Sequence, residues 1–384
     1  MAKIQLLNKI SKVGLKQFDD KYEIGDAIAD PDAILVRSAA MHDMEFGASL
    51  KAIGRAGAGV NNIPVDRCAE EGIVVFNTPG ANANGVKELA VAALMLASRD
   101  IVGGVQWANS LTADVAKSVE KGKSAFAGNE IMGKTLGVIG LGAIGGLVAN
   151  AAVALGMNVI GCDPYITIEG AWHLSSSIQK AASYDEIFEK SDYISLHVPA
   201  TPQTKNMICA ESIAKMKAGV RIINLARADL VNAADLKAAI AEGKVASYVT
   251  DFPTEETIGV KGIVTIPHLG ASTEESEDNC AVMAANELID YLENGNIKNS
   301  VNFPNLNLPH TAAHRVVILH KNIPNTIARI TGSLAEQNIN IENLVNASKG
   351  DYAGTIAETN SPIDDAVIEK IASVDGIIRT IKIS

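Results

Sequence analysis

Cysteine is scarce in this chain: only four occur in 384 residues, with no Cys-x-x-Cys spacing and no histidine at metal-ligand distance. We expect reduced core thiols and no metal site. Lys and Arg total 33 against 44 Asp and Glu, and the net charge of −11 disfavours nucleic acid and anionic membrane surfaces as partners. No uncharged apolar run of about eighteen residues stands out, and residues 1–15 lack the continuous apolar stretch of a secretion leader. We therefore expect a cytoplasmic protein with no membrane partner.

The bulk composition is that of a folded globular protein, with 47% hydrophobic and 20% charged residues. The length predicts two or three domains. An anionic metabolite is compatible with the acidic balance, because a few placed arginines can create a local positive site.

Short β-branched runs alternate with helical segments at the start of the chain, with strands predicted at 4–7, 33–37, 50–57 and 72–79. This βαβα rhythm indicates a parallel sheet with helices on both faces. Residues 84–110 read as one long helix, and the strand-helix rhythm restarts after Gly133.

A second helical pattern, TEESEDNCAVMAANELIDYLENG, begins near Ser272 or Thr273 and is expected to return to the first domain. The Asn- and Pro-rich residues 299–309 indicate a linker. Beyond it, residues 314–384 give the order βαββαβ of a ferredoxin-like unit. We predict an α/β protein with two doubly wound, Rossmann-like domains and a small C-terminal domain. The predicted bounds are 1–95 with 276–305, 96–275, and 312–384.

A glycine motif, Gly140-x-Gly142-x-x-Gly145, lies between the apolar strand TLGVI and an Ala-rich helix. Gly140 permits a tight turn, Gly142 lets the backbone approach a pyrophosphate, and Gly145 lets helix and strand pack closely. The helix N-terminus offers free N–H groups to phosphates. Asp163 ends the next strand, where a carboxylate accepts hydrogen bonds from a ribose and repels a ribose phosphate. The unit therefore predicts NAD rather than NADP.

Polar residues follow three later strands, where open α/β sheets place their ligands. Arg227 follows VRIINLA, Glu255 and Glu256 follow YVTDFPT, and His268 follows GIVTIP. A histidine can take the proton of a hydroxyl during hydride transfer, and a neighbouring carboxylate can orient its ring. An arginine can hold a substrate carboxylate in a two-point grip.

Over roughly its first 305 residues the chain resembles the D-2-hydroxyacid dehydrogenases, in the segments RAGAGVNNI, FNTPGANANGVKELA, GVIGLGAIG, SLHVPATPQT, INLARADLVN, DFPTEE and TIPHLGAS. The resemblance implies that Arg227 grips the carboxylate, His268 transfers the proton and Glu255 is its acidic partner. Two departures occur: Ala228 replaces the usual glycine, and the DFPTEE segment is one residue shorter, which leaves Glu256 as a substitute for Glu255. The cofactor set then comprises Gly140, Gly142, Ala143, Ile144, Asp163, Pro199, Thr204 and Asp251. His197 is read as structural.

Within that family, TIPHLGAST and ILVRSA look most like the members that oxidise 3-phospho-D-glycerate to 3-phosphohydroxypyruvate, the first step of L-serine synthesis. A phosphorylated acid needs cations far from its carboxylate, and Arg37 and Arg55 stand at strand ends. By resemblance Arg37, Asn82 and Arg55 contact substrate, together with Arg227 and His268. A glyoxylate or hydroxypyruvate reductase remains the alternative, and a non-catalytic NAD-sensing co-regulator is a further one.

Residues 314–384 resemble an ACT domain, the regulatory module of many amino-acid biosynthetic enzymes. His320, Asn322 and Asn340 match positions that hold L-serine in related enzymes, and such side chains can pair with an amino acid. The usual Pro-Gly turn reads Pro324-Asn325, where Asn tolerates the same left-handed backbone. A dimerisation module without a ligand fits equally well. A homo-oligomer, dimer or tetramer, is expected.

Overall fold

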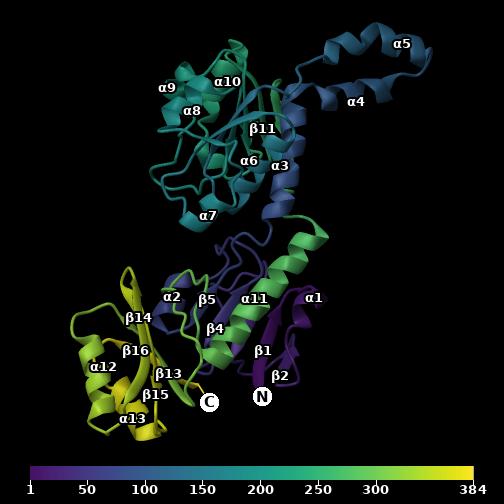
Figure 1. Cartoon of the computed structure of the whole chain (residues 1–384). Helices are drawn as coiled ribbons and strands as arrows, with labels where there is room; N and C mark the ends of the chain where they lie inside the picture. Colours follow the sequence, from purple (N-terminus) through teal and green to yellow (C-terminus); the bar gives the residue numbers. More distant parts are fainter. Residues whose placement is uncertain (384) are drawn as a thin grey trace. The chain divides into compact units, whose positions relative to one another are not determined.

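The computed structural model describes residues 1–383, so Ser384, the last residue of the predicted C-terminal domain, lies outside the described residues. The chain divides into two compact units, which are treated separately below. Unit 1 contains Met1–Ala81 and Glu277–Ser384, and unit 2 contains Asn82–Ser276. Figure 1 labels their helices and strands. Two parallel sheets and one small antiparallel sheet confirm the predicted fold class.

Unit 1 opens with a five-stranded parallel sheet in the order β2-β1-β3-β4-β5. Its central strand β3 reads AILV and is buried along its whole length, as expected for a strand covered on both faces. The elements are β1 (Ala2–Leu7), α1 (Lys12–Leu15), β2 (Tyr22–Gly25), β3 (Ala33–Val36), β4 (Ala52–Arg55), α2 (Val65–Glu70), β5 (Val74–Phe76) and α11 (Glu274–Asn294).

The helix predicted between β3 and β4 was wrong, because residues 38–49 form only turns and irregular backbone. Side chains from elsewhere take the carbonyl groups that a helix would use. The Arg67 guanidinium donates to the His42 carbonyl at 3.2 Å and to that of Met44, and the Asn62 amide donates to the Ala39 carbonyl at 2.8 Å. These partners lie too far along the chain to appear in a local pattern.

The C-terminal domain has the predicted order βαββαβ, with sheet order β14-β15-β13-β16 and all pairs antiparallel. Helices α12 and α13 bury one face of that sheet, where Val316 and Ile318 pack with Ile330 and Leu334. The elements are β13 (His314–Lys321), α12 (Thr326–Ala335), β14 (Ile341–Lys349), β15 (Tyr352–Thr359), α13 (Asp365–Ala372) and β16 (Ile377–Ile383).

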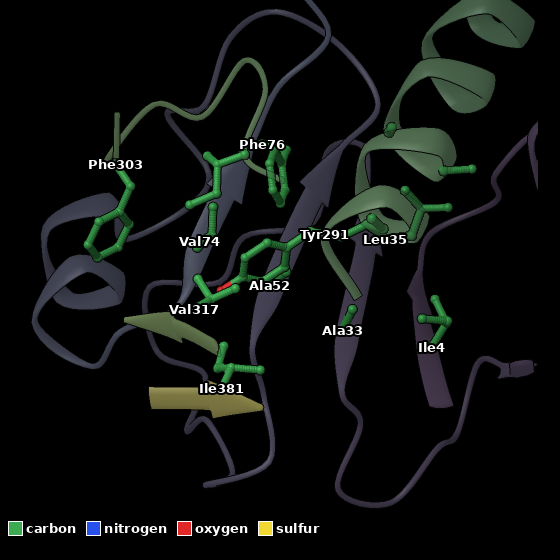
Figure 2. Packing of buried hydrophobic residues seen from close by; sticks show 14 of the residues in the cluster. Ile4, Ala33, Leu35, Ala52, Val74, Phe76, Tyr291, Phe303, Val317 and Ile381 are labelled. Atoms are coloured by element: carbon green, nitrogen blue, oxygen red, sulfur yellow. The ribbon is translucent and has the colours of Figure 1, made fainter. Parts of the chain in front are cut away.

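The opposite face of this small sheet joins the core of the first sheet. Val317 and Ile381 belong to the same buried cluster as Tyr291 of α11 and Ala52 of β4, and Figure 2 shows these side chains together. Strand β13 is therefore buried on both faces, which explains its continuous apolar run VVIL. The C-terminal domain and the first sheet form one packed body.

Unit 2 is a seven-stranded parallel sheet in the order β12-β11-β10-β9-β6-β7-β8. The strand order reverses between β6 and β9, and such a switch point leaves room for a ligand beyond the carboxyl ends of the strands. The strands are β6 (Thr135–Ile139), β7 (Asn158–Cys162), β8 (Gln179–Lys180), β9 (Tyr193–Leu196), β10 (Val220–Asn224), β11 (Val245–Thr250) and β12 (Ile263–Thr265).

The other regular elements of unit 2 are helices. They are α3 (Ala83–Ser98), α4 (Ile101–Ser110), α5 (Val115–Gly122), η1 (Lys123–Phe126), α6 (Ala143–Ala154), α7 (Ile168–Trp172), α8 (Tyr184–Lys190), α9 (Ala210–Lys215), η2 (Ala228–Leu230) and α10 (Ala233–Ala241). Helix α3, which the sequence divided between two domains at residue 95, lies wholly within unit 2. None of the helices within residues 1–383 has the length and apolar composition needed to cross a bilayer.

The single long helix predicted over 84–110 was also wrong. Arg99 is extended, and Asp100 caps the separate helix α4 by accepting a hydrogen bond from the Gly103 N–H at 2.9 Å. Asp side chains favour such caps over helix interiors. Helices α4 and α5 extend away from the rest of unit 2 in Figure 1, and neither contains a buried residue.

Candidate active site

The glycine loop follows β6 at the switch point of the second sheet. Gly140 has a φ of +88°, and a Cβ there would stand 2.5 Å from the His197 carbonyl oxygen. A Cβ on Gly145 would stand 1.8 Å from the Gly140 carbonyl oxygen, whereas one on Gly142 would meet nothing within 4 Å. The first and third glycines thus allow close packing, and the second faces open space.

The first turn of α6 leaves N–H groups free for an anion. Gly142 is its N-cap residue, and no side chain caps the helix there. The N–H groups of Ala143 and Ile144 lie in this turn, where the helix dipole favours negative charge. Open space at Gly142 beside these donors fits a pyrophosphate.

Asp163 connects the glycine loop to a pocket. One carboxylate oxygen accepts from the Leu141 N–H at 2.8 Å, and the other accepts from the Tyr165 N–H at 2.8 Å. The pocket has a volume of about 680 Å³, and its walls include Asp163, Leu174 and Ile178. An ionised carboxylate has further lone pairs, so Asp163 can accept from ribose hydroxyls while it holds the loop.

His197 lies beneath the glycine loop and acts as a neutral support. Its Nε2 is 2.8 Å from the Ser195 hydroxyl, and burial lowers its pKa to about 4. The next turn closes on itself, because the Thr204 hydroxyl donates to the Pro199 carbonyl at 2.6 Å. A ring that stays neutral at pH 7 fits the structural role predicted for it.

Arg227 is presented by a buried residue that sequence reasoning missed. The Asn224 side chain donates to the Arg227 carbonyl at 2.8 Å and to the Tyr248 hydroxyl at 3.0 Å. Its oxygen accepts from the N–H groups of Ala226 and Arg227 at 3.2 and 3.3 Å. Asn224 is fully buried, while the Arg227 side chain is exposed. An asparagine that ends an apolar strand was the available signal.

His268 and Asp251 meet in the neighbouring loops. The His268 ring packs on Phe252 with ring centroids 4.5 Å apart, and one Asp251 oxygen accepts from the Gly270 N–H at 3.3 Å. The other oxygen of Asp251 is buried and has no partner within the described residues. Burial raises the pKa of Asp251, and the charges of His268 and Arg227 partly oppose that rise. The structure thus brings Arg227, Asp251 and His268 together.

Glu255 and Glu256 occupy a different position from His268. Both are exposed and line a pocket of about 520 Å³ together with Asp229 and Tyr248. Within residues 1–383 neither carboxylate makes a hydrogen bond or ion pair with His268. The pairing of Glu255 with His268 stays a prediction.

No group of three His, Cys, Asp or Glu side chains in the described part of the chain is arranged to hold a metal ion.

Arg37 and Arg55 stand side by side in unit 1, at the carboxyl ends of β3 and β4. The Arg55 Nε donates to the Arg37 carbonyl at 3.1 Å, and Arg37 pairs with Glu277 at 2.8 Å. Burial lowers the pKa of Arg55, and the charge of Arg37 lowers it further. Two adjacent cations beside a single carboxylate, that of Glu277, leave a net positive charge here. Asn82, the first residue of unit 2, precedes α3 without capping it through its side chain.

The residues predicted to hold an effector are mostly engaged within the C-terminal domain. His320 is 2% exposed, and its ring nitrogens lie 2.8 Å from the Lys321 carbonyl and 3.1 Å from the Thr355 hydroxyl. Asn322 donates to the Gly350 carbonyl at 3.0 Å, and Asn340 donates to Glu342 at 3.2 Å. Asn325 has a φ of 74°, the left-handed conformation expected where related turns have glycine.

Comparisons with known proteins converge on one family. The family model of the D-isomer specific 2-hydroxyacid dehydrogenase NAD binding domain matches residues 91–271. The D-3-phosphoglycerate dehydrogenase of Mycobacterium leprae is 35% identical over 94% of this chain and 70% of its own. That of Synechocystis is 37% identical over 79% of this chain, which spans only 54% of that relative's length. The NAD+-bound structure of 3-phosphoglycerate dehydrogenase from Entamoeba histolytica matches with a TM-score of 0.60 and 29% identity, covering 78% of this chain and 98% of its own.

Proposed function

The chain belongs to the D-isomer specific 2-hydroxyacid dehydrogenase family, and from this we propose that it oxidises 3-phospho-D-glycerate to 3-phosphohydroxypyruvate with NAD. The observation that carries the proposal is the position of Arg227, Asp251 and His268. They follow β10, β11 and β12, whose last residues pair in register along one edge of the sheet that also carries the glycine loop. Bound NAD would accept the hydride from C2 of the substrate.

The side chains divide the remaining chemistry among them. The guanidinium of Arg227 holds the substrate carboxylate in a two-point grip, which orients the C2 hydroxyl. The ring of His268 takes the hydroxyl proton as the hydride leaves. Asp163 and the N–H groups of Ala143 and Ile144 hold the dinucleotide, and Gly142, Pro199, Thr204 and Asp251 complete its site.

A phosphorylated substrate is favoured by the adjacent cations of unit 1. We assign its phosphate to Arg37 and Arg55, with Asn82 as a further contact. An unphosphorylated acid, as used by a glyoxylate or hydroxypyruvate reductase, gives Arg55 no anionic partner, whereas Arg37 already pairs with Glu277. Relative kcat/KM for 3-phospho-D-glycerate and for acids without phosphate separates the two activities. Arg37→Ala should reduce kcat/KM for the phosphorylated acid selectively.

The central experiment removes the proton-transfer group. His268→Ala should lower kcat about a hundredfold or more while NADH affinity stays nearly unchanged. His173→Ala is the matched control, since His173 is exposed in the same unit. NAD reduction is followed by absorbance and NADH affinity by fluorescence. Unchanged turnover in His268→Ala would remove this assignment, and tight NADH binding without any dehydrogenase activity would favour a non-catalytic NAD sensor.

We further propose that the chain forms a homo-oligomer and that α4 and α5 lie in the interface between subunits. These helices have no buried residue and expose Ile101, Val105 and Val115 at 39, 55 and 52%. Exposed apolar side chains gathered on one segment are typical of a protein interface. Light scattering of the wild type and of Val105→Asp tests this.

A cytoplasmic location is proposed because all four cysteines are unpaired thiols.

L-serine is proposed as an effector of the C-terminal domain through His320, Asn322 and Asn340. The left-handed Asn325 supports the resemblance on which this rests. Because Asn322 already donates to the Gly350 carbonyl, a bound amino acid must replace that hydrogen bond. Initial rates with and without L-serine test the proposal, with Asn322→Ala as the variant expected to lose inhibition.

A further inference from the structure

A further polar cavity lies within unit 1, and none of the residues assigned above lines it. Its volume is about 610 Å³. Its walls come from three segments that are distant in sequence: the residue after β5, the linker before the C-terminal domain, and the end of β14. The lining residues are Asn77, Asn299, Ser300, Val301, Phe303, Pro304, Asn305, Ala347, Ser348 and Lys349.

The linker wall of this cavity is held by hydrogen bonds to the first sheet. Ser300 forms an antiparallel bridge with Phe76, and the Val301 N–H donates to the Val75 carbonyl at 2.9 Å. The side chain of buried Asn302 accepts from the Val75 N–H at 3.0 Å and donates to the Ile73 carbonyl at 2.8 Å. The wall formed by β14 is held in the antiparallel sheet by β15. The cavity is therefore preformed.

Its charge is positive and uncompensated. The Lys349 ammonium donates to the Ser300 carbonyl at 2.8 Å, and within residues 1–383 it has no acidic partner. Lys349 is exposed at the rim of the cavity, and the water that its ammonium has lost lowers its pKa. The other polar wall residues are amides and hydroxyls, and no carboxylate lines the cavity.

The carboxyl group behind the wall does not cancel this charge. The Asn299 amide donates to Glu287 at 2.7 Å, and burial raises the pKa of Glu287 to about 8. Burial therefore favours the neutral form of Glu287. A cation that faces a polar, preformed cavity without a negative neighbour is suited to an oxyanion.

We propose that this cavity binds a small phosphate or carboxylate anion, with Lys349 as the charge partner and Asn77, Asn305 and Ser348 as hydrogen-bonding groups. The anion binding goes beyond the dehydrogenase activity and does not depend on it, whereas an effect of the anion on substrate affinity rests on the proposed role of Arg55. Its position suggests an effector site. The Asn77 amide donates to the Ala58 carbonyl at 2.6 Å, within the turn that follows Arg55.

That turn gives the cavity a direct connection to Arg55. The Thr78 N–H donates to the Gly57 carbonyl at 3.1 Å, and the Arg55 guanidinium lies so close to Gly57 that a Cβ there would meet its Nη1 at 1.6 Å. An anion that moves Asn77 therefore moves the support of one proposed phosphate contact. Its occupancy would alter the affinity of the enzyme for substrate.

The test measures anion binding to the full chain by isothermal titration calorimetry at constant ionic strength. Inorganic phosphate and succinate are the two probes, and they separate a phosphate ligand from a carboxylate ligand. Saturable binding of either is expected in the wild type, weakened roughly tenfold or more in Lys349→Met. Lys298 is an exposed lysine directly before the linker and does not line the cavity, so Lys298→Met should bind as the wild type does.

Two further variants make the result decisive. Arg37→Ala removes the proposed substrate phosphate contact and should leave this binding intact. Ser348→Asp adds a negative charge at an exposed wall position and should abolish the binding, which covers the case in which Lys349→Met does not fold. Absence of saturable binding by both probes overturns the proposal. Binding that is lost in Arg37→Ala but retained in Lys349→Met or Ser348→Asp also overturns it.

Discussion

Replacing Glu358 by glutamine should destabilise unit 1 strongly, because Glu358 and Arg315 form a fully buried ion pair at 2.7 Å. Burial alone would raise the pKa of Glu358, but hydrogen bonds from Asn343, Thr311 and Arg315 outweigh it and hold the pKa at about 2. The Arg315 guanidinium also donates to the carbonyls of Asn294, Leu308 and Pro309 at 2.6, 2.8 and 2.8 Å. The pair thus joins the end of α11, the linker and the C-terminal sheet.

The magnitude follows from the pKa. A carboxyl group whose pKa falls from its ordinary 4.5 to about 2 on folding contributes about 3 kcal/mol at neutral pH. Removing its charge also leaves the guanidinium of Arg315 buried without a counterion, so Glu358→Gln should cost about 3 to 5 kcal/mol. This stabilisation is present above pH 4.5 and is lost as the pH falls toward 2. The difference in the free energy of unfolding between the wild type and Glu358→Gln should therefore shrink as the pH falls through that range.

Urea denaturation followed by circular dichroism measures the difference. Glu336→Gln is the matched control, because Glu336 and Lys370 form an ion pair in the same domain with side chains 65 and 40% exposed. That change should cost less than about 1 kcal/mol. A Glu358→Gln protein within about 1 kcal/mol of the wild type would refute the reasoning.

Three other changes test the site and the core. Asp163→Ser should weaken NAD binding and raise the NADP to NAD preference by about tenfold or more, measured as the ratio of kcat/KM values; an unchanged ratio contradicts the ribose assignment. Asn224→Leu should misplace Arg227 and lower kcat/KM by roughly a hundredfold with little change in NADH affinity, and an unaltered KM for the hydroxyacid would refute the positioning role. Burial raises the pKa of Glu287 to about 8, so the free energy of unfolding of the wild type falls as the pH rises from 4.5 through 8. Glu287→Gln should therefore be more stable than the wild type at pH 9 in urea denaturation, and equal stability there contradicts the buried carboxylate.

The parts of the fold that could be predicted were those set by local pattern. Gly140, Gly142 and Gly145 are close together in sequence, so their spacing after a strand already contained the geometry of the turn. The carboxyl ends of parallel strands meet at one edge, which is why Arg227 and His268 could be placed together. The βαββαβ order of the C-terminal domain followed from short amphipathic segments in the same way.

The parts that could not be predicted depend on contacts between distant residues. The side chain of Arg67 replaces the hydrogen bonds of the helix expected over 38–49, and nothing near that segment reveals it. The end of α3 depends on Asp100 acting as a cap, which the strong apolar period concealed. The burial of Asn224 and of Asp251 follows from the packing of three strands, whereas in sequence each is one polar residue at a strand end.

The two-sided burial of β13 limits how this protein can be divided or recombined. Excising the C-terminal domain would leave Tyr291, Ile297 and Leu306 uncovered on one fragment and Val317 with Ile381 on the other. Both products would expose an apolar surface to water and should aggregate. A chimera with a different C-terminal domain must therefore also carry residues at the end of α11 that match the apolar face of the new domain. Without them the two parts will not pack together.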